Sequence, residues 1–315
     1  MLNKRKLDLI SKKLGYEISS YSFLGAGAHN FNYLLNSRER KFVLRISSIN
    51  KNPLIEEYRV LKLLENTNLA PKVYICDLSK KIINKNYLIE EYLEGKHPKN
   101  DEEFIKNMGK WYKILHNNKT NRIPKFARKN NYYSLIKALG AHGLKDYKKS
   151  IHHLEGKIRI RTEEIYNKMI TIIKEKDKLL HKRNNFSLIH GDPWSENIFL
   201  TKTGIKLVDW EFAEYDLPEW DLMQFIRHYC YNEERKKIFL NSYRYKINSL
   251  TKEIFNVIEL IESFSTLAWF INRLRLIKEN KIQEKHSHHN KKKVENRIIK
   301  ELKKTRQIIK NSNFF

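Results

Sequence analysis

Residues 188–200 constrain this chain more than any other stretch of it, and they read LIHGDPWSENIFL. An apolar segment leads into a turn with glycine and proline, and a second apolar segment begins after Asn197. A further apolar run, 205–208, ends at Asp209. Short apolar runs bounded by turn residues are typical of buried strands. We therefore expect a strand end, a loop and a second strand region, with Asp192, Asn197 and Asp209 around one site.

The composition sets the frame for this site. The chain has 315 residues, of which 41% are apolar, enough for one large domain or two lobes with a buried core. Its formal net charge of +26 indicates either contact with a polyanion or a surface rich in lysine. The two cysteines, Cys76 and Cys230, can form neither a disulfide framework nor a metal site, which favours a reducing compartment.

The N-terminus and the hydropathy predict the location. Residues 1–13 are charged and have no apolar signal region, and no window approaches eighteen apolar residues. We expect a cytoplasmic protein with no transmembrane segment.

The first ninety residues or so predict a small α+β lobe. The expected elements are a helix at 6–14, a glycine-rich turn between two strands within 22–35, a strand at 41–47, a helix at 53–65, and strands at 73–77 and 86–92. In the strand at 41–47, Phe42, Leu44 and Ile46 share one face, while Lys41, Val43 and Arg45 share the other.

After Gly95 the pattern becomes mainly helical. The expected elements are helices at 101–116, 132–139 and 155–182, the strand–loop–strand core at 186–209, and helices from Pro218 to the end. We divide the chain into an N-lobe at 1–94, a C-lobe at 95–275 and a basic helical tail at 276–315. From Arg273 to Lys310 there are fourteen Lys or Arg against four Glu, which suits contact with nucleic acid or an acidic membrane, or a solvated face.

The polar residues of the central core suit phosphoryl transfer. This reaction requires bound phosphates, neutralisation of their charge by a metal, and an acceptor hydroxyl that is placed and deprotonated late. Asp192 is the expected catalytic base, and Asn197 and Asp209 offer the oxygen ligands that Mg²⁺ prefers. His190 is expected to support the loop rather than transfer protons. The alternative, a structural turn, does not account for all four residues following apolar strands.

The same residues resemble the aminoglycoside phosphotransferase and choline kinase family, small-molecule kinases with a protein-kinase-like fold. The resemblance covers about residues 20–275. It rests on four motifs, which are His-Gly-Asp-x-x-x-x-Asn at 190–197, Asp-Trp-Glu at 209–211, Asp-Leu at 221–222 and Leu-His at 115–116. It implies a bilobal α+β fold, with a small antiparallel-sheet N-lobe containing one main helix and a larger, mainly helical C-lobe.

The resemblance also implies a phosphate loop in the N-lobe. The family's Gly-x-x-Asn-x-x-Tyr pattern matches Gly27, Asn30 and Tyr33. Gly25 and Gly27 would let backbone N–H groups approach the phosphates of ATP closely. Such a glycine turn between strands is frequent, so it is weak evidence by itself.

Further nucleotide contacts follow from the same resemblance. Arg45 stands where kinases often have a phosphate-pairing lysine, and Glu57 is its expected carboxylate partner, with Glu56 as a rival. Arginine keeps its charge and can bind two phosphate oxygens at once. An exposed ion pair between strand and helix is the alternative. The join of the lobes implies that adenine is read by the backbone carbonyl of Glu91 and the N–H of Leu93.

One acidic, aromatic stretch bears on the substrate. Residues 209–221 contain six carboxylates and three large aromatics besides Phe212, and no Lys or Arg. Carboxylates and aromatic faces suit a cationic alcohol such as choline, ethanolamine or an aminoglycoside. An equally good explanation is that Asp209 binds metal, Asp221 caps or braces the catalytic loop, and the remaining acids are solvated. The expected substrate contacts are Trp194, Glu211, Tyr215 and Trp220.

The leading hypothesis is therefore an ATP- and Mg²⁺-dependent phosphotransferase that acts on a hydroxyl of a small molecule. The residues do not distinguish ATP from GTP. The alternative is a catalytically silent kinase-like protein that binds RNA or acidic membrane through its basic surface. A protein kinase is disfavoured because Asp221 follows Asp209 by twelve residues, too few for a long activation segment.

Overall fold

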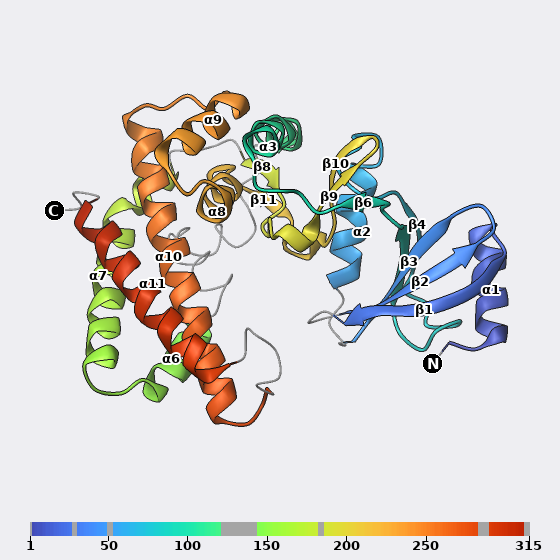
Figure 1. Ribbon diagram of the computed structural model, residues 1–315, viewed down its shortest axis with the longest axis horizontal. Helices are drawn as coiled ribbons and strands as arrows, with labels where there is room; N and C mark the ends of the chain where they lie inside the picture. Colours follow the sequence, from blue (N-terminus) through green and yellow to red (C-terminus); the bar gives the residue numbers. More distant parts are fainter. Residues whose placement is uncertain are drawn as a thin grey trace. The chain divides into compact units, whose positions relative to one another are not determined.

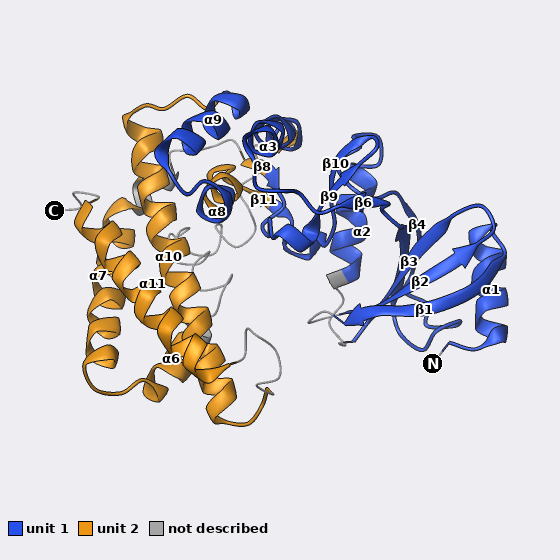
Figure 2. Ribbon diagram, viewed as in Figure 1, with its two compact units in different colours: residues 1–117, 188–214, 225–244 blue, residues 118–187, 215–224, 245–315 orange. Residues whose placement is uncertain are grey.

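The computed structural model describes residues 2–26, 30–48, 53–120, 144–181, 186–282 and 290–311 (Figure 1). The chain forms two compact units (Figure 2), of which unit 1 comprises residues 1–117, 188–214 and 225–244, and unit 2 the remainder. The predicted helix at 132–139 and Gly27 lie outside the described residues. The predicted boundaries at residues 94 and 275 divide the chain by expected function, whereas the two units are defined by their compactness. The predicted division therefore stays a prediction.

Unit 1 opens with one helix and a five-stranded antiparallel sheet in the order β1-β2-β3-β5-β4. The elements are α1 (Lys4–Leu14), β1 (Ile18–Ala26), β2 (Asn30–Ser37), β3 (Lys41–Ser47), α2 (Pro53–Leu63), β4 (Val73–Asp77) and β5 (Tyr87–Glu91). Phe42 and Leu44 of β3 are buried with Ile10 of α1, as the predicted alternation requires. The antiparallel sheet with one main helix after β3 confirms the predicted first lobe.

A second part of unit 1 carries a three-stranded sheet and helices. Its elements are β6 (Gly95–Lys96), α3 (Glu102–Leu115), η2 (Ser195–Asn197), β9 (Ile198–Thr201), β10 (Gly204–Leu207), η3 (Trp210–Phe212) and α9 (Glu233–Tyr243), with the end of α8 (Glu219–Tyr229). The strand order is β10-β9-β6. Asp101 begins α3 by accepting a hydrogen bond from the N–H of Phe104 at 2.8 Å. Trp111 of α3 donates to the carbonyl of Ile205 at 3.0 Å, which joins this helix to β10.

Unit 2 is mainly helical, and α10 is its longest helix (Figure 1). Its elements are β7 (Lys119–Thr120), α6 (Leu144–Ser150), η1 (Ile151–His153), α7 (Gly156–His181), α10 (Ser249–Lys278) and α11 (Lys291–Asn311), with parts of β8 (Phe186–Ile189), β11 (Glu214–Asp216) and α8. Asn248 and Thr251 form a reciprocal capping box at the start of α10. Helices α6, α7 and α11 pack against α10.

The apolar content of α10 corrects one expectation. The helix is long and apolar enough to cross a membrane, since an 18-residue window within it has a mean hydropathy of 1.5. The sequence was expected to hold no such stretch. However, 67% of this window is buried inside the structure, as in the core helix of a soluble protein. The stretch was missed because polar residues interrupt its apolar run.

The basic tail is the helix α11, which has an apolar stripe. Val294, Ile298, Leu302 and Ile309 are buried, and the helix packs on α10. Its other face is exposed and basic. The helix thus combines a charged surface with an apolar stripe that packs on α10.

A buried carboxylate connects α1 to the sheet. Asp77 accepts hydrogen bonds from Lys13 Nζ at 2.6 Å, from Tyr87 Oη at 3.1 Å, and from the N–H and hydroxyl of Ser79 at 2.8 and 2.7 Å. Burial by itself would raise the pKa of Asp77, but these hydrogen bonds hold it well below its usual range. The carboxylate therefore stabilises the fold as long as it is ionised.

Asp77→Asn is expected to lower the free energy of unfolding by about 1–3 kcal/mol at pH 7, because the buried Tyr87 hydroxyl and the more exposed Lys13 and Ser79 lose a charged acceptor. The contribution of Asp77 is fully present above the pKa of an unfolded aspartate, about 4, and is lost as the pH falls toward its lower folded pKa. Urea unfolding between pH 3 and 7 should thus show a shallower acid dependence in the variant. Asp8→Asn, at an exposed position of α1, is the matched control. Equal stability of the two variants would contradict this role of Asp77.

Candidate active site

The loop that follows β8 is held in shape by hydrogen bonds within unit 1. The N–H of Trp194 donates to the carbonyl of Asp192, and the N–H of Asn197 to the carbonyl of Trp194, both at 2.9 Å. Tyr229 donates its hydroxyl to the carbonyl of Pro193 at 2.9 Å. The loop therefore has a defined backbone from which Asp192 projects.

Asp192 and Asn197 are in direct contact. The Asn197 amide nitrogen donates to the backbone carbonyl of Asp192 at 3.1 Å and to its Oδ2 at 3.0 Å. Burial and then the charge of Asp209 raise the pKa of Asp192 to about 7, although the hydrogen bond from Asn197 acts in the opposite direction. A carboxyl with such a pKa suits proton transfer near neutral pH.

His190 links this loop to the segment that ends at Asp209. Its Nε2 lies 3.0 Å from the carbonyl of Val208, and its Nδ1 lies 3.2 Å from the N–H of Asp192. Since a carbonyl only accepts and an N–H only donates, Nε2 carries the proton and Nδ1 accepts. The ring is fully buried and packs edge-on against Trp210 at 4.5 Å between centroids. These contacts agree with the expected supporting role.

Asp209 has an uncommon backbone conformation for its residue type. It precedes η3 with φ 65° and ψ 64°, in the left-handed region that non-glycine residues seldom adopt. Its side chain is 36% exposed, and Oδ1 lies 3.1 Å from Nη2 of Arg45. Such strain is often found at functional sites, where surrounding contacts maintain it.

The residues present fit a magnesium ion. Mg²⁺ is usually held by one or two carboxylates, together with water and substrate phosphates. Asp209 offers a partly exposed carboxylate. Asn197 uses its amide nitrogen toward Asp192, and within the described ranges its Oδ1 accepts no hydrogen bond. The donor set is therefore one carboxylate and one neutral oxygen, beside a second carboxylate at Asp192.

Arg45 lies at the centre of a buried charge cluster. The residue is 5% exposed, and its Nη1 donates to Oε1 of Glu57, which also accepts the N–H of Trp210 at 3.2 Å. Burial lowers the pKa of Arg45. Its carboxylate partners, Glu57 foremost, have the opposite and larger effect, so the pKa is raised overall and the guanidinium stays charged. The expected pairing with Glu57 is present, and it is buried rather than the exposed pair of the alternative.

The rival carboxylate has a different partner. Glu56 forms an exposed ion pair with Arg59 at 2.6 Å, one turn along α2. The helix therefore directs Glu57 inward and Glu56 outward.

Glu90 is a member of this cluster that the sequence did not predict. Its Oε1 lies 3.7 Å from Nη1 of Arg45, and the residue is 4% exposed. Burial raises the pKa of Glu90 to about 8, while Arg45 acts in the opposite direction. The available signal was strand register, because β5 places Glu90 opposite Val43, two residues from Arg45 on β3.

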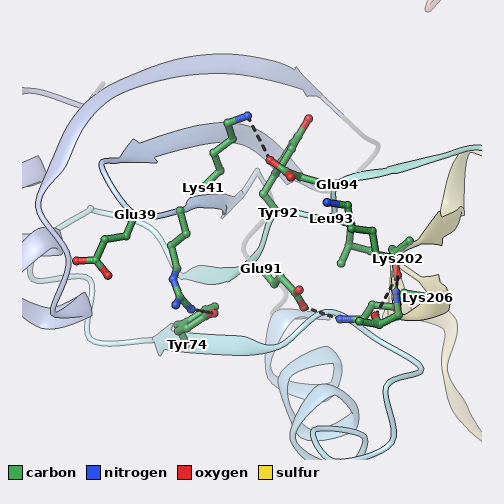
Figure 3. Close-up of a pocket in the computed structure, with 12 residues that line it drawn as sticks. Glu39, Lys41, Tyr74, Glu91, Tyr92, Leu93, Glu94, Lys202 and Lys206 are labelled. Atoms are coloured by element: carbon green, nitrogen blue, oxygen red, sulfur yellow. Dashed lines mark hydrogen bonds and ion pairs between the residues drawn. The ribbon is translucent and has the colours of Figure 1, made fainter.

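A pocket of about 360 Å³ lies against residues 91–94, the expected join of the two lobes (Figure 3). Its twelve lining residues include Glu91 and Leu93, the expected adenine contacts, but not Arg45 or Asp192. Figure 3 shows Glu91 directed toward Lys206, and their ion pair measures 2.8 Å. The pocket is thus distinct from the cluster around Arg45, and its charged residues pair largely with one another.

The phosphate loop is described in part. Gly25 lies at the end of β1, and a Cβ there would meet no heavy atom within 4 Å. Asn30 begins β2, is buried and stands opposite Ser47 of β3. The contacts of Gly25, Gly27 and Asn30 with phosphates stay predictions.

Two of the expected substrate residues lie in unit 1 and are accessible. The Trp194 side chain is 53% exposed, and its ring centroid lies 4.4 Å from that of His228. Glu211 is partly exposed within η3. Both belong to the same unit as Asp192.

The other two lie in unit 2, where burial alters the expectation. Tyr215 is partly exposed, but Trp220 is 1% exposed and has no free face for a ligand in this structure. Three further acids of the stretch, Asp216, Glu219 and Asp221, are fully buried. The alternative view of the remaining acids as solvated is therefore wrong for Asp216 and Glu219, whereas Asp221 was expected to cap or brace the loop. Glu219, for example, accepts the hydroxyl of Tyr245 at 2.8 Å.

Comparison with known proteins gives matches over most of the chain. A model of the phosphotransferase enzyme family matches residues 20–245. The chain is 28% identical over 184 residues to a protein LicA homolog of Metamycoplasma hominis, and 28% identical over 182 residues to one of Mycoplasma capricolum subsp. capricolum. These alignments cover 58% of this chain and 63% and 65% of the relatives, so the match spans less than two thirds of their length.

Solved structures show the same fold. Choline kinase LicA from Streptococcus pneumoniae has a TM-score of 0.63 at 18% identity, covering 96% of this chain and 100% of its own. A spectinomycin phosphotransferase in complex with ADP and spectinomycin has a TM-score of 0.62 at 13% identity, covering 100% and 99%. A Plasmodium vivax ethanolamine kinase has a TM-score of 0.59 at 15% identity, covering 93% and 83%. The predicted protein-kinase-like fold is confirmed.

Gly191→Ala is expected to destabilise the catalytic loop. Gly191 has φ +81°, and an added Cβ would lie 2.9 Å from the carbonyl oxygen of Phe212. We expect a loss of about 1–3 kcal/mol in the free energy of unfolding, from backbone strain and this clash. Gly25→Ala is the matched control, because its Cβ would have open space and its φ is not positive. Urea unfolding of both variants measures the difference, and equal losses would refute the steric argument.

Proposed function

The chain belongs to the phosphotransferase enzyme family, and from that membership we propose that it transfers the γ-phosphate of ATP, with Mg²⁺, to a hydroxyl of a small molecule. The observation that supports this most is the grouping of Asp192, Asn197, Asp209 and Arg45 within one compact unit. Phosphoryl transfer is catalysed mainly by positioning and charge, which these residues can supply.

Each residue has a distinct task in this proposal. Asp192 accepts the proton of the acceptor hydroxyl. Asn197 orients the Asp192 carboxylate through its hydrogen bond to Oδ2. Asn197 and Asp209 would hold Mg²⁺, which neutralises charge on the phosphates when bound. Arg45 would pair with phosphate oxygens while Glu57 holds the guanidinium.

The nucleotide is proposed to be ATP. The spectinomycin phosphotransferase contains ADP, and LicA has been crystallised with AMP, so two proteins of similar fold bind adenine nucleotides. We propose that the carbonyl of Glu91 and the N–H of Leu93 read the adenine, and that Gly25, Gly27 and Asn30 lie over the phosphates. Whether GTP also serves as the phosphate donor is tested by comparing the two nucleotides directly.

The acceptor is proposed to be a cationic alcohol. The curated relatives are named as homologues of LicA, and the solved LicA is a choline kinase. Trp194 and Glu211 are accessible in the unit that contains Asp192, and an aromatic face with a carboxylate suits an amine or quaternary ammonium. We propose these two as substrate contacts, and the expected contact of Tyr215 stays a prediction. The cytoplasmic location stays a prediction.

The silent alternative has no specific observation in its favour. A binding protein without catalysis would be expected to lack the base, a metal ligand or the arginine–glutamate pair, and all of these are present.

Asp192→Ala and Asp209→Ala are each expected to reduce ADP release at least about 100-fold, because one removes the base and the other a metal ligand. Asp8→Asn, at an exposed site on α1, is expected to retain activity. Circular dichroism establishes that the variants are folded. If either alanine variant kept near-normal turnover, the assignment of that residue would be wrong.

A screen of acceptors tests the substrate class. We expect ADP release from ATP with choline, ethanolamine or an aminoglycoside, since the accessible carboxylate and aromatic groups favour a cation. Neutral sugars serve as the comparison set, and each acceptor is also tested with GTP. Reaction only with neutral or anionic alcohols would refute the cationic assignment while leaving the phosphotransferase proposal intact.

A further inference from the structure

The cluster around Arg45 contains more carboxyl groups than this arginine can pair with. One guanidinium faces three carboxyl groups, those of Glu57, Glu90 and Asp209. Oε2 of Glu57 is buried and has no hydrogen-bond partner in the described part of the chain. Since a buried carboxylate without compensation is costly, the cluster is suited to receive further positive charge.

Asp209 has two competing partners. Its Oδ1 accepts Nη2 of Arg45 at 3.1 Å, and the same carboxylate is the proposed metal ligand. Arg45 occupies Oδ1, which leaves Oδ2 of this carboxylate for a metal ion, and two cations on one carboxylate repel each other. Metal binding therefore weakens the hold of Asp209 on Arg45, which must then be kept in the site by its other partners.

Glu90 is placed to keep Arg45 in the site during this exchange. It belongs to β5, whose register with β3 places Glu90 opposite Val43, diagonal to Arg45 on the same sheet. The sheet fixes its position, and its carboxylate approaches Nη1, whereas Asp209 binds Nη2. Glu90 thus acts on a different guanidinium nitrogen from the one that Asp209 binds.

Glu57 alone does not supply this second anchor. Its Oε1 serves both Arg45 and the N–H of Trp210, the residue directly after Asp209. Any shift of the Asp209 segment on metal binding would act on Glu57 through that hydrogen bond. Glu90 has no such connection to the segment among the contacts of the described residues.

We propose that Glu90 is a positioning residue that retains Arg45 beside the phosphates and so frees Asp209 for the metal. This inference rests on the proposed phosphotransferase function. It assigns Glu90 a part in the coupling between metal and nucleotide, and no contact with the reacting atoms. Loss of its charge strengthens the hold of Arg45 on Asp209, and metal binding becomes weaker.

The test compares ATP binding with and without metal. Isothermal titration calorimetry of ATP in Mg²⁺ and in EDTA, at pH 9 and thus above the pKa of Glu90, gives the factor by which Mg²⁺ tightens ATP binding. Glu90→Gln, which keeps the shape but not the charge, is expected to reduce this factor about tenfold, within the usual range of coupling between two sites. ATP binding in EDTA is expected to change about threefold or less, because the phosphate contact with Arg45 remains.

Two further variants separate positioning from structure. Glu90→Asp keeps the charge one methylene further from Arg45, and its factor is expected between those of the wild type and Glu90→Gln. Glu56→Gln removes an exposed carboxylate of α2 that pairs with Arg59, and it is expected to match the wild type. If Glu90→Gln does not fold, Glu90→Asp decides, and a wild-type factor in Glu90→Asp then overturns the proposal.

The outcomes separate the two proposals. If the wild type does not bind ATP with Mg²⁺, the phosphotransferase function itself fails. If the wild type shows the metal dependence and folded Glu90→Gln shows it equally, only the role of Glu90 is overturned. Equal weakening of ATP binding in Mg²⁺ and in EDTA also overturns it, because that result indicates a general structural defect.

Discussion

A buried arginine is the constraint on which the first unit depends. The Arg45 guanidinium is almost inaccessible to water, so its charge must be met by carboxylates held in place around it. These come from α2, from β5 and from the segment after β10. Removing one partner of a buried pair typically costs about 3–5 kcal/mol, because the other charge is left uncompensated. The need to satisfy one cation thus brings together segments far apart in the sequence.

Trp210 joins this cluster to the catalytic loop. Its N–H donates to Glu57, while its ring packs against His190, and His190 in turn accepts the N–H of Asp192. The left-handed backbone of Asp209 allows this arrangement, since Trp210 is buried while the Asp209 side chain stays partly exposed. The proposed base, Asp192, and the proposed metal ligand, Asp209, are therefore held by one continuous set of contacts. The strained backbone of Asp209 permits this set of contacts.

The parts that could be predicted from sequence are those with a local physical signature. The strands at 41–47 and 73–77 have the predicted bounds, because alternating apolar residues and turn residues mark them. The pairing of Arg45 with Glu57 followed from resemblance. The membership of Glu90 did not, because a charged residue in an apolar strand suggests an exposed position unless its partner is known. Burial of Asp216 and Glu219 was missed for the same reason, since burial is decided by distant segments.

The charge of the whole chain and the charge of the site have opposite signs. The chain carries +26, and α11 contributes an exposed basic face, so the long-range field attracts an anionic nucleotide. Around Arg45 three carboxyl groups face one cation, with Asp192 near them, so the centre offers bare phosphates little net positive charge at short range. The proposed divalent cation would supply this charge. A basic surface that collects anions and a carboxyl-rich centre are therefore compatible in one protein.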